Sequence, residues 1–403
     1  MLPITIVVLA GCLQTGLAIG LVTALKHQAA RRPDLPDEPG RGLLSAFNFL
    51  LIALLLTASV VLDLLGTRTG FLVACLSLSL GLALLSLSRP SGKASAQFIL
   101  AGLGATMLYL VTLHLMPRGL LGEQKVVASM LFGFVLIGLG GLLAGPLLEI
   151  LLQVIGYRFT MLGFGGLALG PLGLALAAEA NLFPSLANGA NTGQATGLPE
   201  INLFPPAPNY DPIALLREPR IWFAGLVFAF YAPLESFVTV WVATYLRQQN
   251  QLDRSAHWLG WFWLTFLGSR VLIGVLQHVC SIDDGYQPAL LICSALLAAV
   301  FLGNLTGSSS TITALYGVIA LGFVLGPVLP TLLATLSRVP QTGSAPSLTF
   351  ALVHSVGAIG SVVLAPLVHS SAEEQTPQQA LWVPLILALL MTAAALLYTF
   401  TGR

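Results

Sequence analysis

Two charged residues, Glu235 and Arg270, each lie near the middle of a long apolar run of the sequence. A charge at the centre of a membrane span costs about 2.5–3.5 kcal/mol on insertion scales, so it requires a partner, water or a function. The two runs follow one another along the chain, and as neighbouring membrane spans they would be antiparallel. We therefore expect that Glu235 and Arg270 can meet near the middle of the membrane.

The residue types allow two interpretations of this pair. A carboxylate that faces a guanidinium stays charged, and the pair then fixes two helices against each other. A carboxylate in an apolar, partly dry cavity can instead take up a proton near neutral pH. A proton or substrate that neutralises Glu235 would then release Arg270 and change the relative energies of two conformations. The sequence leaves both interpretations open.

Other polar side chains lie at depths where they could face a cavity. They need hydrogen bonds, either to neighbouring helices or to a polar substrate. The histidines have the further alternative of donating to a backbone carbonyl. Glu149 lies near the end of its run and is expected at the membrane interface. The remaining candidate substrate-binding residues are Gln14, Asn48, His114, Tyr231, Trp241 and His354.

The composition indicates where these residues must act. Of the 403 residues 56% are hydrophobic and only 8% are charged, whereas soluble proteins carry about 25% charged residues. The chain is therefore expected in a lipid bilayer. A net charge of +1 without a basic cluster excludes nucleic-acid binding. The isolated cysteines form no metal-ligand or redox pattern, so we expect no metal and no cofactor. Coupling to protons is one option, and the sequence leaves the coupling ion open.

Continuous apolar runs of about 20 residues predict membrane-spanning helices rather than the short alternating strands of a barrel. The predicted class is an all-α polytopic membrane protein. The twelve runs cover residues 3–25, 43–62, 71–88, 96–116, 126–152, 159–178, 220–245, 258–279, 288–304, 312–336, 344–368 and 381–400.

The longest polar stretch divides these runs six and six. It is rich in Asn, Gly and Pro and cannot form a packed core, so we interpret it as a linker. We predict an N-terminal six-helix bundle over 1–178, a central cytoplasmic linker over 179–219 and a C-terminal six-helix bundle over 220–403.

The fifth and eleventh runs each contain small residues followed by a proline, at similar positions within the run. The fifth run holds Gly141, Gly145 and Pro146, and the eleventh holds Gly360 and Pro366. Small residues let helix backbones approach closely, and proline removes a helical hydrogen bond and permits bending. These positions are candidate helix bends for gating, and ordinary tight packing is the alternative.

The loop after the second run resembles the signature G-x-x-x-D-R-x-G-R-[KR] of the major facilitator superfamily. Asp63, Gly66 and Arg68 match it, whereas the sequence departs from it at Ser59, Leu64 and Thr67. The resemblance implies two pseudo-symmetric six-helix bundles. It also implies that Asp63, Gly66 and Arg68 form a conformational latch that stabilises the outward-facing state.

The second half is similar to the sugar-porter-like branch that includes fucose permease. The resemblance lies in the run Phe230–Glu235, in Trp241 and Tyr245, and in the triplet Gly268–Arg270. The acidic residues of helices one and four of that branch are absent, so its proton-coupling residues do not carry over. The fifth run matches the family's exporter motif only in part, at Gly141, Gly145 and Pro146.

These observations predict a monomeric secondary transporter that moves a small organic solute by alternating access. Proton-coupled uptake of a sugar-like or other polar nutrient is favoured, with drug or metabolite efflux as the alternative. A non-transporting membrane enzyme or sensor is the alternative of another class, but no convergent catalytic set is visible and we expect no enzyme. The Lys and Arg residues do not set the orientation, so a cell-membrane protein with both termini cytoplasmic follows from the resemblance alone.

Overall fold

The computed structural model describes residues 2–30, 39–87, 95–182, 212–248, 255–280, 286–307, 311–337, 339, 345–374, 376 and 378–401. Their regular structure is helical, and twelve stretches within them are long and apolar enough to cross a membrane. The all-α, twelve-span architecture predicted from the sequence is confirmed. Within the predicted linker, residues 183–211 lie outside the described part of the chain, and so the linker stays a prediction.

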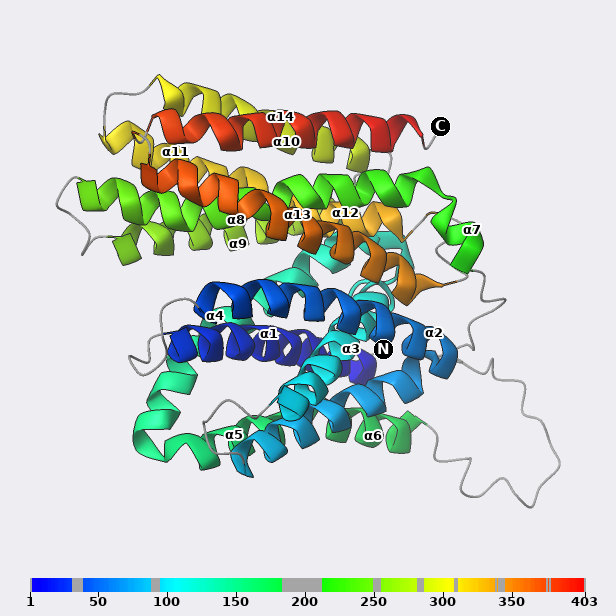
Figure 1. Ribbon diagram of the computed structural model, residues 1–403. Helices are drawn as coiled ribbons and strands as arrows, with labels where there is room; N and C mark the ends of the chain where they lie inside the picture. The colour runs from blue at the N-terminus through cyan, green and yellow to red at the C-terminus, as the bar shows by residue number, and fades with distance from the viewer. Residues whose placement is uncertain are drawn as a thin grey trace, which may run out of the picture. The chain divides into compact units, whose positions relative to one another are not determined.

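Contacts divide the chain into two units (Figure 1). Unit 1 comprises Met1–Pro36, Thr57–Glu123 and Leu136–Tyr210, and unit 2 comprises Asp37–Leu56, Gln124–Val135 and Asp211–Arg403. Two long helices, α2 (Pro39–Leu87) and α4 (Val126–Val154), contribute residues to both units. The other helices of unit 1 are α1 (Leu2–Ala30), α3 (Ser95–Gly119), α5 (Gly156–Ala168) and α6 (Gly170–Leu182).

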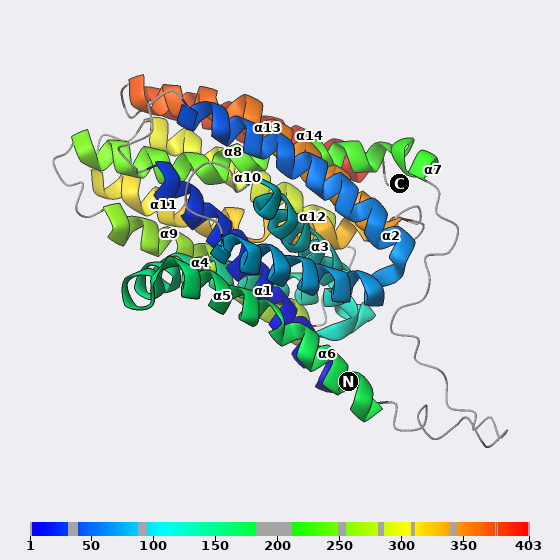
Figure 2. The ribbon, with the colours of Figure 1, turned by 60° about the horizontal axis from the view of Figure 1, so that its bottom comes forward.

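In unit 2 the helix α8 packs against α13 and α14, and α9 packs against α11 (Figure 1, Figure 2). Short breaks divide single membrane spans into α5 and α6 in unit 1 and into α11 and α12 in unit 2. The elements that complete the fold are η1 (Glu123–Lys125), α7 (Pro212–Leu216), α8 (Pro219–Gln248), α9 (Ser255–Val279), α10 (Gln287–Thr306), α11 (Thr311–Leu325), α12 (Val328–Leu336), α13 (Pro346–Glu374), η6 (Gln379–Leu381) and α14 (Trp382–Phe400).

The helix α2 holds two spans joined at a sharp turn. Gly66 has φ 77° and ψ 163°, a conformation that side chains with a Cβ rarely adopt, and the chain reverses there (Figure 2). A Cβ at this position would meet no atom within 4 Å. Glycine is therefore required by the backbone conformation and not by packing. The turn lies within the segment that resembles the family signature.

Glycines also set where long helices cross. In unit 1, a side chain on Gly16 or Gly140 would overlap the backbone of the facing helix, so α1 and α4 meet backbone to backbone. In unit 2, Gly360 of α13 lies against the backbone of α8 at Ala229. Close approach of this kind is how small residues strengthen helix packing in membranes. The helices α1, α8 and α13, which meet at these crossings, contain candidate site residues.

Candidate substrate and coupling site

Three of the predicted site residues come together in unit 2. Tyr231 and Glu235 lie one helical turn apart on α8, and Arg270 lies on α9. Tyr231 is fully buried and Arg270 is 5% exposed, whereas Glu235 is half-buried. The Glu235 carboxylate interacts electrostatically with the Arg270 guanidinium. The three side chains therefore form one polar group, which we call the α8–α9 polar group.

The Tyr231 hydroxyl is the unusual member of this group. It lies within hydrogen-bonding and electrostatic reach of both Glu235 and Arg270, although neither contact has the geometry of a regular hydrogen bond. A buried polar atom left without any partner would cost about 1–3 kcal/mol. The interaction with these two charged groups therefore couples Tyr231 to the pair.

Arg270 is held by groups that the sequence did not indicate. Its Nε donates to the carbonyl of Gly326 at 2.7 Å, and its Nη1 donates to the carbonyl of Phe134 at 3.2 Å. The guanidinium carbon lies 4.3 Å from the ring centre of Phe266 and 5.5 Å from that of Phe134. Backbone carbonyls and aromatic faces both stabilise a desolvated cation. Arg270 is therefore more than a counter-ion of Glu235.

An aromatic cluster extends from this group along α8. Phe228 lies edge-on to the His354 ring, with centroids 5.0 Å apart, and also contacts the Tyr231 ring at 6.0 Å. Trp241 stacks on Tyr245, with ring centres 4.8 Å apart and planes 8° apart. The Nδ1 of His354 lies 2.7 Å from the Phe350 carbonyl of its own helix, so this ring nitrogen has a backbone partner.

The other predicted ligands belong to α1, α2 and α3. Gln14 is buried in α1 and His114 is half-buried in α3, both in unit 1. The side chain of Asn48 in α2 lies outside the described part of the structure. The structure thus brings together the candidates of α8 and α9, and it leaves the roles of Gln14, Asn48 and His114 as predictions.

The predicted latch and helix bends are only partly described. Asp63 is buried at 5% exposure in α2, and Gly66 forms the turn, but the side chain of Arg68 lies outside the described part. Both helices that contain the marked prolines continue through them, and the side chains of Pro146 and Pro366 are exposed. A gating role for these residues stays a prediction.

The motif glycines of α4 differ in how they meet α1. The backbone of Gly141 lies in the contact, because a Cβ on Gly20 would come within 2.9 Å of the Gly141 Cα, but a Cβ on Gly141 itself would be no closer than 3.8 Å to any atom considered. A Cβ on Gly145 would have no neighbour within 4 Å, whereas one on Gly140, which the motif does not indicate, would overlap the α1 backbone. Rotation of about 100° per residue explains why adjacent glycines face different surroundings.

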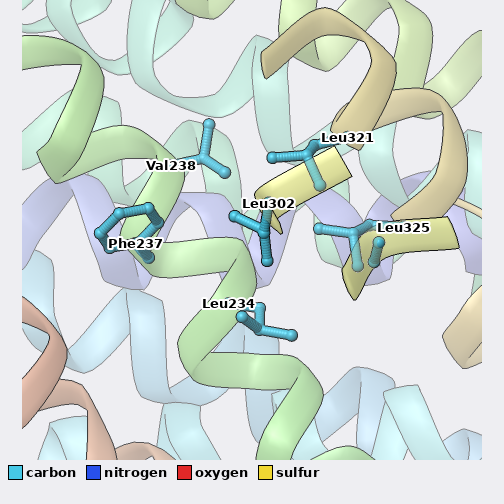
Figure 3. A pocket seen from close by; sticks show the side chains of 7 residues that line it. Leu234, Phe237, Val238, Leu302, Leu321 and Leu325 are labelled. Atoms are coloured by element: carbon cyan, nitrogen blue, oxygen red, sulfur yellow. The ribbon is translucent and has the colours of Figure 1, made fainter. Parts of the chain in front are cut away.

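A narrow apolar pocket lies inside unit 2. Its walls come from α8, α10 and α11, and its space has no room for a water molecule. Figure 3 shows aliphatic and aromatic side chains turned toward it. It offers no hydrogen-bonding group to a polar solute. The lining residues are Leu234, Phe237, Val238, Ala298, Leu302, Leu321 and Leu325.

A second polar contact that the sequence did not indicate joins η1, directly before α4, to the end of α9. Lys125 Nζ donates to the His278 carbonyl at 3.0 Å and lies 3.2 Å from His278 Nδ1. One helical turn away from His278 on α9, Gly274 faces the ring of Phe132. The sequence offered no signal for these pairs because they join residues far apart in the chain. Among the described residues, no cluster of His, Cys, Asp or Glu could hold a metal ion.

The fold resembles solved transporters over nearly its whole length. The fucose:proton symporter FucP of E. coli, in an outward conformation, matches with a TM-score of 0.70 at 13% identity, covering 98% of each chain. The human organic anion transporter TETRAN matches with 0.69 at 17% identity, covering 98% of this chain and 99% of the other. The proton:xylose symporter XylE matches with 0.66 at 16% identity, covering 97% and 94%.

Sequence comparison adds no relative: no protein-family model and no curated protein matches the chain. The structural matches are similar in fold at identities that carry no information on substrate. The chain is a multi-pass membrane protein with the fold of major facilitator superfamily transporters, as the loop around Gly66 predicted.

Proposed function

We propose that this chain is a secondary active transporter that moves a small organic solute by alternating access, with proton-coupled uptake of a sugar-like or other polar solute as its activity. The observation that carries the proposal is the likeness of nearly the whole chain to two proton symporters and an organic anion transporter. In transporters built from repeats the solute site lies near the middle of the membrane.

The α8–α9 polar group is the proposed coupling element. Glu235 is half-buried, whereas Arg270 and Tyr231 are buried, so Glu235 is the member of the group that would exchange a proton. Protonation of Glu235 removes its attraction for Arg270 and so changes the relative energies of the two conformations. Trp241, His354, Gln14, His114 and Asn48 are the proposed solute ligands.

Two further proposals accompany this function. Asp63, Gly66 and Arg68 form the conformational latch at the turn of α2, and Pro146 and Pro366 permit helix bending. The protein lies in the cell membrane with both termini in the cytoplasm. Labelling of single-cysteine variants, one for each loop, on intact cells tests the orientation: an Arg31→Cys variant that reacts only from the cytoplasmic side would overturn it.

Uptake into proteoliposomes tests the function. A panel of sugars, organic anions and amines is offered with and without an inward proton gradient. We expect Glu235→Gln to lose gradient-driven accumulation and to retain exchange of the solute. The matched control is Glu149→Gln, because Glu149 is exposed on α4, and this variant should accumulate solute normally. Unchanged accumulation by Glu235→Gln would exclude the proton-carrier role, and stabilisation of the purified protein by apolar cations alone would favour efflux.

A further inference from the structure

The tenth span contains a break at which a backbone carbonyl lacks its helical partner. The span runs over Ile312–Leu336, but α11 ends at Leu325 and α12 begins at Val328. The carbonyl of Gly326 would normally accept from the N–H of the residue four positions on, and that residue is Pro330, which has no N–H. In a membrane, a carbonyl left in this way must find another donor.

Glycines bring α9 close enough to supply that donor. A Cβ on Gly322 would overlap α9 at Phe262 and Thr265, and one on Gly326 would overlap it at Phe266 and Ser269. These two glycines lie one turn apart on the face toward α9. The Thr265 hydroxyl lies 3.0 Å from the Ile319 carbonyl of α11 and 3.0 Å from the Phe262 carbonyl of its own helix, so it can donate across this contact. The α9–α11 contact is thus one in which α9 side chains can reach α11 carbonyls.

Arg270 is the next donor along this contact. We infer that Arg270 is a positioning residue for the broken tenth span, because its Nε supplies Gly326 with the hydrogen bond that Pro330 withholds. Its second bond, from Nη1 to the Phe134 carbonyl, joins the same side chain to α4. A guanidinium can serve both carbonyls at once through separate N–H groups of a rigid fork, which an ammonium cannot do in the same way.

This assignment goes beyond the proposed function and holds whether or not Glu235 carries protons. It also explains how a guanidinium is tolerated at this depth, since two carbonyls and the Phe266 ring surround it. Under this inference the loss of Arg270 damages the break between α11 and α12. Under an ion-pair role alone, the loss would act on Glu235 and leave the break intact.

A double-mutant cycle between Arg270 and Pro330 tests the inference on the full-length protein in detergent. Pro330→Ala returns a backbone N–H to the position that faces the Gly326 carbonyl. We expect Arg270→Met, whose side chain has no hydrogen-bond donor, to lower the melting temperature and to speed amide hydrogen exchange in peptides from α11 and α12. The double variant should recover a large part of both losses, because the alanine N–H replaces the missing donor. In the parent protein, Pro330→Ala should have a much smaller effect.

The matched control is Pro146→Ala, which restores a backbone N–H at a proline of α4 several turns beyond Phe134. Pro146→Ala should change the melting temperature and the amide hydrogen exchange equally in the parent protein and in the Arg270 variant. Equal effects of Pro330→Ala in the parent and in Arg270→Met would overturn the inference, since independent sites add. If Arg270→Met does not fold, the cycle is run with Arg270→Lys, which keeps the charge beside Glu235 and has a methylene in place of Nε. Equal effects of Pro330→Ala in the parent and in Arg270→Lys would overturn the inference as well.

Discussion

In unit 1, α1 and α4 touch through their backbones, whereas in unit 2, α8 and α13 touch largely through side chains. Gly16 and Gly20 of α1 face the α4 backbone, and Gly140 of α4 faces the α1 backbone in return. Across the crossing in unit 2 only Gly360, among the described glycines, meets backbone atoms, at Ala229. The crossing in unit 1 therefore leaves no space for a side chain at these positions.

The contact in unit 2 is different because it holds polar and aromatic groups. Gly357 lies against the Phe228 ring, and this ring contacts both Tyr231 and His354. Glycine here makes room for a side chain of the partner helix instead of for its backbone. Glycines at helix crossings therefore have different roles in the two units. In unit 1 they let two backbones touch, and in unit 2 Gly357 makes space for the Phe228 ring of a polar and aromatic cluster.

The largest effect is expected from Gly140→Val. The new side chain would overlap the backbone of α1 at Leu13 and Leu17, and a backbone cannot move aside as a rotamer can. We expect a loss of stability of about 3 kcal/mol or more, and so little folded protein. Size-exclusion chromatography of the detergent-solubilised protein measures the folded fraction.

Its matched control lies on the same helix. A Cβ on Gly145 would meet no atom within 4 Å, so Gly145→Val should yield folded protein close to the parent level. Equal yields of the two variants would show that the backbone-to-backbone crossing in unit 1 does not determine folding. Equal losses would show instead that α4 tolerates no valine at either glycine.

A smaller difference in stability is expected between alanine substitutions at the two glycines of α13, Gly360 and Gly357. Gly360→Ala would press on the backbone of α8 and should cost about 3 kcal/mol. Gly357→Ala presses on the Phe228 ring, which can leave its rotamer at a cost of about 1 kcal/mol. Melting temperatures of the two variants, measured under the same detergent conditions, test the order. The reverse order would contradict the proposed distinction between backbone and side-chain contacts.

The sequence predicted the spans well because each is a continuous apolar run. The predicted runs 126–152 and 220–245 agree closely with the spans Val126–Val154 and Pro219–Leu246. The run 312–336 predicted one continuous helix, whereas the structure divides it into α11 and α12. Pro327 and Pro330 inside this run are the residues that indicate such a break, because neither can donate a helical hydrogen bond.

The surroundings of the candidate site could not be predicted in the same way. The pair of Glu235 and Arg270 was inferred from adjacent helices, and the structure gives them an electrostatic interaction. The carbonyls that hold Arg270 belong to Gly326 and Phe134, and nothing in their local sequence places them near α9. A backbone acceptor has no residue type that reveals it, so only the three-dimensional packing identifies it.

The smallest changes in stability are expected when one buried hydroxyl group is removed from each unit. In unit 1, Thr15 donates to the Gly11 carbonyl at 2.8 Å and Thr112 donates to the Leu108 carbonyl at 2.6 Å. Each hydroxyl has a single proton, so their mutual contact at 3.4 Å gains little. Thr15→Val should change the stability by less than about 0.6 kcal/mol and leave transport unchanged.

In unit 2 the Tyr231 hydroxyl is buried and lies within reach of Glu235 and Arg270, but without the geometry of a regular hydrogen bond. Tyr231→Phe keeps the aromatic ring beside Phe228 and removes a weakly bonded oxygen, so the stability should change by no more than about 1 kcal/mol. Gradient-driven transport should fall, because the hydroxyl within reach of Glu235 and Arg270 is lost. Thr15→Val is the control, measured by melting temperature and uptake together. A Tyr231→Phe variant that is less stable and transports normally would show that this hydroxyl has a structural partner and no part in coupling.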